Sequence, residues 1–223
     1  MEAKGSAPSN DSDVRRLAVI NALELDEPEA LALILGGFDD EEAVVRAEAA
    51  RAIAEIPGPH MLVPLLGLLE DPDEAVRRAA ADTLAECNQE HLRDLYETWI
   101  VSDKPFTRAA VLRAVRPLKI EGAARYALLG LKDASIPVRI ESVGVLGYLQ
   151  DPSYLKDLAQ MALQDESADV RRIAMGAISY RLTPETAAAA IAGLEDAAWQ
   201  VREDAHWYVR YFLWWRSSPP PSG

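Results

Sequence analysis

The chain has 223 residues, of which 49% are hydrophobic and 26% are charged, a composition typical of a soluble folded protein. Acidic residues outnumber basic ones by 36 to 23, which gives a formal net charge of −13. This charge disfavours nucleic acid and an anionic membrane surface as partners, because both are bound largely through exposed Lys and Arg. Cys87 is the single cysteine, so the sequence offers neither a disulfide framework nor a cysteine-based metal cage.

The first residues are small and polar and contain no apolar stretch of the kind found in secretion signals. No later apolar run approaches the roughly 20 residues that span a membrane. We therefore expect a cytoplasmic protein without a membrane-spanning segment. Residues 1–13 and the Pro-rich residues 216–223 are expected to be disordered tails, because they offer nothing to bury. The folded region is expected to cover residues 14–215.

An arginine recurs through the folded region at a period of 31 residues, with a single gap of 32. Valine precedes it in six of the seven copies, and an acidic residue stands six positions before it in five copies. A period of this length indicates one supersecondary unit repeated along the chain. The arginines are Arg15, Arg46, Arg77, Arg108, Arg139, Arg171 and Arg202, and the acids are Asp40, Asp71, Asp133, Asp165 and Asp196.

Each repeat has the pattern of two helices joined by a turn. In the repeat around Arg77, the turn Asp71-Pro72 precedes apolar or small residues at offsets −1, +3, +7 and +10 from the arginine, the spacing of one helical face. Another apolar segment, residues 60–71, precedes the turn and predicts a first helix that packs antiparallel to the second. We expect an all-α fold of about six helix pairs preceded by an N-terminal half repeat.

The recurring arginines and aspartates predict a structural ladder. A turn carboxylate can accept hydrogen bonds from backbone N–H groups at the start of a helix, and it can pair with a guanidinium from the neighbouring repeat. A role in ligand binding is disfavoured, because residues that recur with the period of the scaffold serve the scaffold. The predicted members are Arg46, Arg77, Arg139, Arg171 and Arg202 with Asp40, Asp71, Asp133, Asp165 and Asp196.

These features resemble the HEAT-repeat family, in particular its short-repeat bacterial branch of phycobilisome-lyase-like repeats. The matching features are the turn acid, the Val-Arg pair, the small residue at offset +3 and the Leu or Ile at offset +7, with Pro64 inside a first helix. The resemblance covers about residues 14–215. It implies a right-handed α-solenoid in which the second helices line a concave surface that usually binds partners.

The repeat around Arg108 departs from the pattern. The acid is displaced by one position to Asp103, Thr107 replaces the valine, and Pro117 interrupts the second helix. Proline disfavours helical continuation at the residue before it. We expect a bend or hinge within residues 102–120.

The outward positions of the second helices predict a partner-binding site. Their N-terminal half is acidic, whereas their C-terminal half is apolar and aromatic, and exposed aromatic residues are typical of binding hot spots. We expect a protein partner here, presented as a helix or an extended peptide. The alternative is that the tyrosines only cover seams between repeats. The predicted residues are Glu48, Glu55, Glu86, Phe106, Ile140, Tyr148, Ile173, Tyr180, Trp199, Trp207 and Tyr211.

The last predicted helix, residues 204–216, holds three of the five tryptophans. A terminal repeat usually presents a polar outer side, and this one is aromatic instead. Its aromatic residues Tyr208, Phe212, Trp214 and Trp215 are consistent with a hydrophobic cap, a contact with another subunit or partner, or continuation into a longer chain.

The sequence contains no catalytic motif. His60, His91 and His206 lie far apart, with no spacing typical of a metal site, and no phosphate-binding loop or nucleophile motif occurs. We therefore expect a non-catalytic scaffold, adaptor or assembly factor without a cofactor. The resemblance leaves a second hypothesis, a bilin lyase or cofactor-attachment chaperone of the phycobilisome-lyase type. A third, a HEAT-like DNA glycosylase using Trp207 and Asp204, is disfavoured by the acidic charge.

Overall fold

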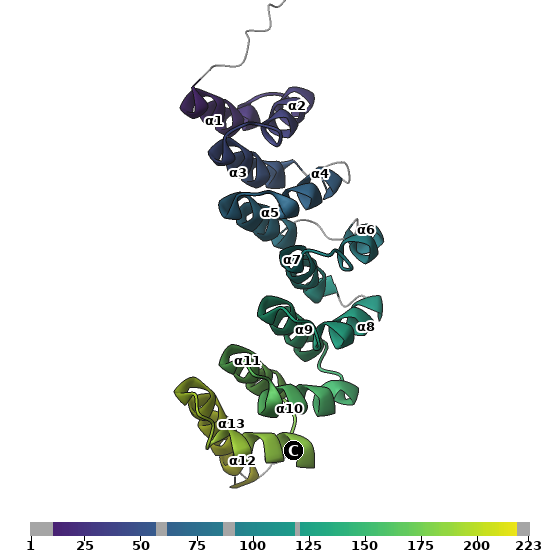
Figure 1. Cartoon of the computed structure of the whole chain (residues 1–223), viewed down its shortest axis with the longest axis vertical. Helices are drawn as coiled ribbons and strands as arrows, with labels where there is room; N and C mark the ends of the chain where they lie inside the picture. The colour runs from purple at the N-terminus through teal and green to yellow at the C-terminus, as the bar shows by residue number, and fades with distance from the viewer. Residues whose placement is uncertain (1–10, 57–61, 87–91, 119–120, 218–223) are drawn as a thin grey trace, which may run out of the picture. The chain divides into compact units, whose positions relative to one another are not determined.

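The computed structural model describes residues 11–56, 62–86, 92–118 and 121–217, and these residues form helices and turns without a strand (Figure 1). The all-α fold class is thereby confirmed for the described part of the chain. The first helices of the pairs are α2 (Glu27–Gly37), α4 (Leu62–Gly67), α6 (Leu92–Trp99), α8 (Glu121–Gly130), α10 (Leu155–Gln164) and α12 (Pro184–Gly193). The second helices are α3 (Ala43–Ala52), α5 (Glu74–Glu86), α7 (Pro105–Val115), α9 (Ile136–Leu149), α11 (Ala168–Ile178) and α13 (Trp199–Ser217).

The unpaired helix α1 (Ser12–Asn21) precedes six pairs in the described residues, as the half repeat in the sequence predicts. Asp11 caps α1 by accepting a hydrogen bond from the Asp13 backbone N–H at 2.9 Å. The helix therefore begins two residues before the expected boundary at residue 14, and α13 runs two residues beyond the expected boundary at 215. The expected disordered tails otherwise lie outside the described residues.

The chain divides into two compact units, Met1–Ala114 and Val115–Gly223, called here the N-terminal and the C-terminal unit. The division falls inside the range where the sequence predicts a bend. In the N-terminal unit the half-repeat helix α1 and the second helices α3 and α5 pack side by side (Figure 1). In the C-terminal unit α9, α11 and α13 do the same. Each unit therefore has one layer of first helices and one layer of second helices.

The core of each repeat lies where the helical periodicity predicts it. In α5, Val76, Ala80 and Leu84 are completely shielded from solvent. They occupy offsets −1, +3 and +7 from Arg77. The apolar face of the second helix is therefore buried against its own first helix and the neighbouring second helices.

Glycines in three first helices allow unusually close contact with the small residue at offset +3. A Cβ added to Gly37 would lie 2.9 Å from the Ala49 Cβ, and one added to Gly193 would lie 3.0 Å from the Ala205 Cβ. These separations are too short for two carbon atoms, so any larger residue would force the helices apart. The three pairs are Gly37–Ala49, Gly130–Ser142 and Gly193–Ala205.

The additional residue in the 32-residue gap is accommodated after α9. Gln150 adopts a left-handed conformation with φ of 52° and ends the helix, and the short 3-10 helix η6 (Pro152–Tyr154) leads into α10. By contrast, α1, α3 and α7 lead into the 3-10 turns η1 (Ala22–Glu24), η2 (Ile53–Glu55) and η5 (Arg116–Leu118).

Candidate protein-interaction surface

The repeating aspartates shape the turns that lead into the second helices. Each accepts a hydrogen bond on its carboxylate from the backbone N–H two residues later, which is an Asx turn. The acceptor–donor pairs are Asp40–Glu42 at 2.9 Å, Asp71–Asp73 at 2.8 Å, Asp133–Ser135 at 2.9 Å, Asp165–Ser167 at 2.8 Å and Asp196–Ala198 at 2.8 Å. The carboxylates are therefore held in the same orientation in these five turns.

Four of the recurring arginines bridge to the aspartate of the following repeat. In each case Nε and Nη2 donate to the two carboxylate oxygens, a bidentate geometry that strengthens and orients the pair. The Nε–carboxylate distances are 2.7 Å for Arg15–Asp40, 2.7 Å for Arg46–Asp71, 2.8 Å for Arg139–Asp165 and 2.7 Å for Arg171–Asp196. The side chains of Arg139 and Asp165 are the most shielded, with 7% and 5% exposed. The spacing of the sequence motif thus corresponds to contacts between successive repeats.

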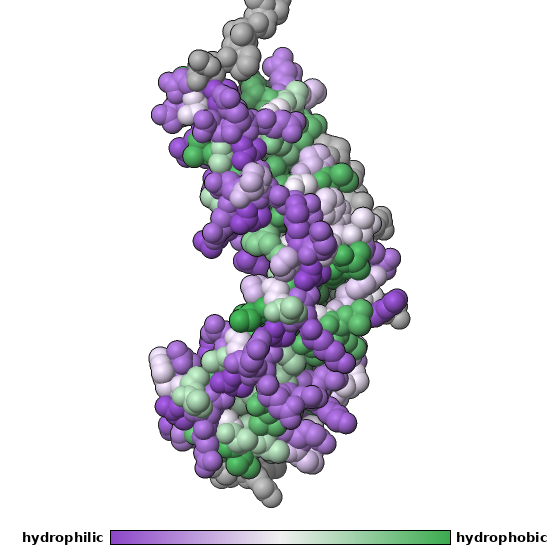
Figure 2. All heavy atoms as spheres, viewed as in Figure 1, coloured by the Kyte–Doolittle hydropathy of each residue, from purple (hydrophilic) through white to green (hydrophobic). Residues whose placement is uncertain are grey.

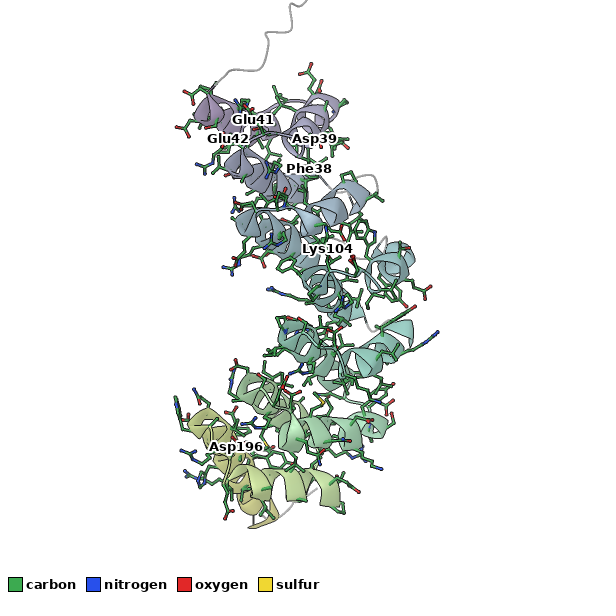
Figure 3. All side chains as sticks on the ribbon, viewed as in Figure 1. Phe38, Asp39, Glu41, Glu42, Lys104 and Asp196 are labelled. Carbon is green, nitrogen blue, oxygen red and sulfur yellow. The ribbon has the colours of Figure 1, made fainter. Side chains whose placement is uncertain are left out.

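The third donor of the guanidinium holds the arginine's own turn. Arg46 Nη1 donates to the carbonyl oxygens of Asp40 at 2.7 Å and Glu41 at 3.0 Å. The same two contacts, to the carbonyls six and five residues earlier, are made by Arg77, Arg108, Arg139, Arg171 and Arg202. Figure 3 labels two such turns, at Glu41 and at Asp196. Sequence reasoning missed these carbonyl contacts, although the constant Asp-to-Arg separation is the signal for them.

The ion pairs shift the acidity of the turn carboxylates. The hydrogen bond from Arg15 lowers the pKa of Asp40, and that from Arg171 lowers the pKa of Asp196. Burial would raise the pKa of Asp71, but hydrogen bonds from Arg46 and the Asp73 backbone outweigh it and leave this pKa lowered. These carboxylates are therefore held in the ionised form that the arginines need.

The ladder is interrupted at Arg77. Ser102 stands where the other repeats have an aspartate, and Arg77 makes no ion pair among the described residues. Its guanidinium carbon lies 5.5 Å from the centre of the Phe106 ring, within the range of a cation–π contact. The expected Asp-mediated ladder therefore needs correction here. Phe106, predicted as a partner-binding residue, is half-buried beneath the arginine of the preceding repeat.

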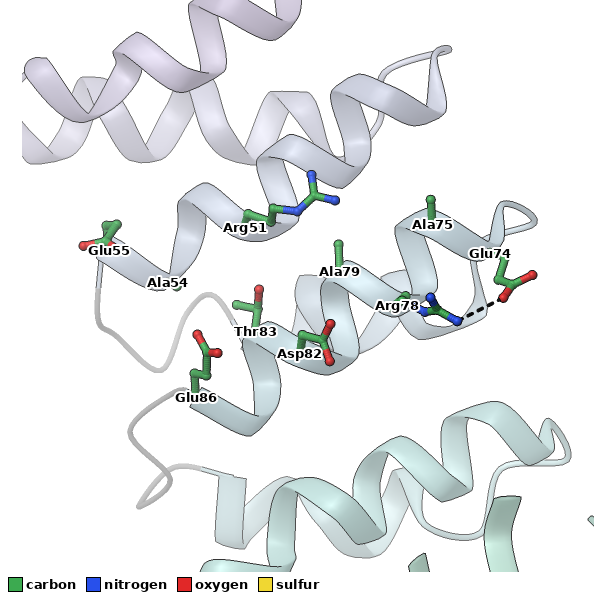
Figure 4. Close-up of a pocket in the computed structure, with 10 residues that line it drawn as sticks. All are labelled: Arg51, Ala54, Glu55, Glu74, Ala75, Arg78, Ala79, Asp82, Thr83 and Glu86. Carbon is green, nitrogen blue, oxygen red and sulfur yellow. Dashed lines mark hydrogen bonds and ion pairs between the residues drawn. The ribbon is translucent and has the colours of Figure 1, made fainter. Parts of the chain in front are cut away.

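The second-helix face of the N-terminal unit carries charges of both signs. A groove of about 610 Å³ lies between α3 and α5, with Arg51 and Glu55 on one side and Glu74, Arg78 and Glu86 on the other (Figure 4). The pair Arg78–Glu74 is joined at 3.4 Å. In the view of Figure 2, hydrophilic side chains cover much of α1, α3 and α5. The face predicted as acidic therefore also carries basic side chains that neutralise part of it.

The three predicted acids of this face have different surroundings. Glu48 has only 16% of its side chain exposed and lies 2.9 Å from Arg16 and 3.7 Å from Arg51. Glu55 and Glu86 are exposed and line the groove between α3 and α5. The structure therefore brings Glu55 and Glu86 to one groove and places Glu48 in an ion-pair cluster.

The second-helix face of the C-terminal unit carries exposed aromatic side chains. Trp207 and Tyr211 on α13 stack with ring centroids 5.5 Å apart and an interplanar angle of 7°. Their exposed fractions are 62% and 43%, and Trp199 at the start of the same helix is 61% exposed. Tyr148 at the end of α9 is 46% exposed. These four predicted residues are accessible to a partner.

The remaining predicted residues of this unit are less accessible. Ile140, Ile173 and Tyr180 are half-buried. The Tyr180 hydroxyl donates to the Asp151 carbonyl oxygen at 3.3 Å, and burial raises the pKa of Tyr180. Tyr180 thus fits the alternative of a tyrosine that covers a seam between repeats.

Tyr208 in the last helix faces the core. It is 1% exposed, and its hydroxyl donates to the Arg181 carbonyl oxygen at 3.2 Å. Tyr208 therefore contributes to covering the last repeat. The side chains of Phe212, Trp214 and Trp215 lie outside the described residues, and so do His60 and His91. The hypotheses of a subunit contact or a longer chain stay predictions.

No three His, Cys, Asp or Glu side chains gather in a way suited to a metal ion within the described ranges. No helix in the part of the chain that the structure describes is both long enough and apolar enough to cross a membrane.

Comparison with known proteins supports the repeat assignment. The family model for HEAT repeats matches residues 6–85 and 124–210. The Escherichia coli protein YibA is 17% identical, with a TM-score of 0.64 over 95% of this chain and 78% of that one. An engineered protein is 15% identical, with a TM-score of 0.52 over 81% of this chain and 95% of that one.

A further solved structure is the complex of CpcE and CpcF of phycocyanin lyase from a Nostoc species. It is 21% identical and covers 95% of this chain and 91% of that chain, and its TM-score of 0.48 is too low to support an argument. No curated protein matches the chain. Because the HEAT-repeat model matches well over half of the residues, the chain belongs to the HEAT-repeat family.

Proposed function

We propose that the protein is an interaction module, acting as a scaffold, adaptor or assembly factor, and that it binds a partner protein through the second-helix face of the C-terminal unit. The observation that supports this proposal is the exposed stack of Trp207 and Tyr211. Large aromatic groups in water are costly to leave uncovered, and Trp and Tyr dominate the binding energy of many interfaces.

The neighbourhood of the stack supports a protein partner. Trp199 extends the exposed aromatic surface along the same helix, and Tyr148 adds to the second-helix layer from α9. Such rings provide a large contact area with few rotatable bonds, which keeps the entropy cost of binding low. A helix or an extended segment of another protein fits a surface of this kind.

The test is a double substitution, Trp207→Ala with Tyr211→Ala, compared with the single control Ile191→Ala. Ile191 is an equally exposed apolar residue, at 62%, on the first helix α12 of the same unit. The partner is first identified by affinity capture from the source organism with the wild-type chain and then purified. We expect the double variant to lose at least tenfold in affinity, as about 1.4 kcal/mol would give, while Ile191→Ala binds normally.

Circular dichroism on all variants shows whether helicity is retained. Unchanged affinity of the folded double variant for the purified partner contradicts the proposal. The bilin-lyase hypothesis predicts a different result, a change in visible absorbance when the chain is mixed with a free bilin. Such a change, abolished by the double substitution, would favour the lyase over the adaptor.

A further inference from the structure

Helix α1 lies at the end of the row formed by α1, α3 and α5 in the N-terminal unit (Figure 1). It has the sequence of a second helix, with the Val-Arg pair at Val14 and Arg15. No described first helix precedes it, and its main contacts are with α2, α3 and η1. One side of α1 is therefore that of a second helix without its own first helix.

The positions that form the core in other repeats are exposed on this side. Val14 at offset −1 is 50% exposed and Leu25 at offset +10 is 45% exposed, whereas Val45 and Ile56, at these offsets in the next repeat, are 1% and 6% exposed. The small residue at offset +3 is also exposed here and is buried in the six later repeats. These positions and their exposed neighbour at offset +2 are called the open α1 face: Val14, Leu17, Ala18 and Leu25.

In the later repeats a first helix covers these positions. A Cβ added to Gly37 of α2 would lie 2.9 Å from the Ala49 Cβ and 4.0 Å from Val45 Cγ1. The buried side of α2 consists of Ala30, Ile34 and Gly37, spaced i, i+4 and i+7. Three other first helices bury residues at the same spacing, namely Ala123, Ala127 and Gly130, then Leu155, Ala159 and Ala162, then Thr186, Ala190 and Gly193. The repeat itself thus specifies what fits the open α1 face: a helix with small or apolar residues at i and i+4 and Gly or Ala at i+7.

The open α1 face also lacks the polar residues that protect an end left in water. His206 on α13 is such a residue, because it is exposed at offset +4, where Val19 and Met175 are buried against the following first helix. In contrast, α1 keeps Val14 and Ala18, the residue types of a covered repeat. Its composition is that of a contact surface.

The charges beside this face indicate the chemistry of its occupant. Asp13 and Glu24 are exposed and make no ion pair among the described residues. They stand four residues before and seven residues after Leu17, so all three lie along one edge of the helix. Arg15 and Arg16 are bound to carboxylates of the next repeat, at 2.7 and 2.9 Å. Every other charged residue from 11 to 30 is acidic, namely Asp11, Asp26, Glu27 and Glu29.

This arrangement favours a basic partner over a second copy of the chain. Two copies of the open α1 face would bring their acidic edges together, in a chain whose net charge is already −13. Like charges across an interface oppose association, whereas Lys or Arg on the other side favours it.

We propose that the open α1 face binds an amphipathic helix of a partner protein, with Gly or Ala at its contact with Ala18 and with Lys or Arg along the edge next to Asp13 and Glu24. This helix takes the place of a first helix and completes the half repeat. Val14 and Ala18 are then covered as their counterparts are in the later repeats. The site lies in the other unit from the aromatic stack of the proposed function and does not depend on it.

The probe is a fluorescent peptide of about 14 residues, close to four helical turns, titrated into the full chain. It carries the buried face of α2, with Ala30, Ile34 and Gly37, and Lys at its exposed positions. We expect it to bind and to become helical by circular dichroism. A matched peptide with Glu at the exposed positions should bind at least tenfold more weakly, and so should a Lys peptide with Leu at the position of Gly37.

Substitutions in the chain locate the site. Val14→Ala with Leu17→Ala should weaken the Lys peptide at least tenfold. The matched control is Val44→Ala on α3, because Val44 is 52% exposed and lies outside the face; it should bind normally. Asp13→Lys with Glu24→Lys should reverse the preference, so that the Glu peptide binds more tightly than the Lys peptide. Circular dichroism checks that all variants keep their helicity.

The remaining outcomes separate this inference from the proposed function and from other occupants. Trp207→Ala with Tyr211→Ala should leave peptide binding unchanged. The inference is overturned if the Lys peptide does not bind, or if Val14→Ala with Leu17→Ala has no effect. It is also overturned if light scattering shows a dimer that Val14→Lys dissociates, because the occupant is then a second copy. A variant without residues 2–10 that binds the peptide at least tenfold more tightly would assign the face to the chain's own first residues and would overturn it too.

Discussion

The second-helix faces of the two units are built on the same helix pairs and differ in chemistry. In the N-terminal unit, charged side chains pair with one another, as in Arg16–Glu48 at 2.9 Å and Arg78–Glu74 at 3.4 Å. In the C-terminal unit, Trp207 is 62% exposed and stacks on one neighbouring ring. Polar groups that satisfy one another gain little from a partner, whereas exposed rings gain from being covered.

The turns beneath these faces do not differ in the same way. Arg15–Asp40 and Arg46–Asp71 in the N-terminal unit have the same bidentate geometry as Arg139–Asp165 and Arg171–Asp196 in the C-terminal unit. The comparison therefore separates a scaffold, whose residues recur with the repeat, from outward positions that vary. Substitutions in the first class should change stability in both units, and those in the second should change binding.

The largest effect is expected from breaking the most shielded ion pair. Asp165→Ala leaves the Arg139 guanidinium, 7% exposed, without its main acceptor and should lower the free energy of unfolding by about 3–5 kcal/mol. The corresponding change in the N-terminal unit, Asp71→Ala, should cost a comparable amount, because the Asp71 side chain is 6% exposed. Urea unfolding followed by circular dichroism measures both.

The matched control for these substitutions is Glu74→Ala. It breaks an Arg–carboxylate pair in which both side chains are 73% exposed, and it should change stability by less than about 0.5 kcal/mol. A loss as large as that of Asp165→Ala would contradict the separation of scaffold from face.

The next effect distinguishes a ladder aspartate from an aspartate of the face by pH. The pKa of Asp71 is lowered, so its contribution to stability is present above about pH 4 and is lost as pH falls through the folded-state value. Burial raises the pKa of Asp204 on α13, so its ionised form opposes folding. The contribution of Asp204 to the free energy of unfolding therefore declines as the pH rises through its ordinary and folded-state pKa values. Asp71→Asn should lower the free energy of unfolding at pH 7, and this variant should lose less stability than wild type as the pH falls. Asp204→Asn should instead raise the free energy of unfolding at pH 7.

Unfolding measured at intervals from about pH 3 to about pH 7 checks both signs. The difference between Asp204→Asn and wild type should disappear as Asp204 becomes protonated. If both variants shift stability in the same direction at pH 7, the contrast between ladder and face fails.

A smaller effect is expected where a first helix contacts its second helix most closely. A Cβ added to Gly130 would overlap the Ser142 hydroxyl and lie 3.3 Å from the Ser142 Cβ. Gly130→Ala should therefore cost about 1–3 kcal/mol. Ser142→Ala removes the clashing hydroxyl, which is buried without a hydrogen-bond partner, and should restore most of the loss in the double variant. Additive losses in a double-mutant cycle would contradict this contact.

The sequence predicts the scaffold well because the scaffold repeats. The 31-residue period locates the helix pairs, and the Asp-to-Arg spacing of six residues corresponds to turns closed by Arg46 on Asp40 and Glu41. The sequence does not predict the glycine that contacts the small +3 residue, because glycine occupies offset −9 in only three repeats, and Ala162, Leu68 and Trp99 occupy it in the others. A contact that varies between repeats leaves a weaker periodic signal.

The outward face is harder to predict because it depends on contacts between repeats. The outward positions of the second helices, compared between repeats, place Glu55 in the charged half and Trp207 in the aromatic half. They do not show that Glu48 lies close to Arg16 and Arg51. They also do not show that Phe106 lies beneath Arg77.

The smallest expected effect concerns the glycines of the aromatic face. A Cβ added to Gly176, within α11, would meet nothing within 4 Å, whereas one added to Gly144 would lie 3.0 Å from Arg116 Nη1. Gly176→Ala should therefore stabilise the chain by about 0.5–1 kcal/mol, and Gly144→Ala should gain less because the Arg116 side chain must move. Thermal unfolding of the two variants tests this order, and a loss of stability in Gly176→Ala would contradict it. If Gly176→Ala is more stable but binds the purified partner more weakly, the open space at Gly176 contributes to binding. The partner site would then extend from the Trp207–Tyr211 stack onto α11.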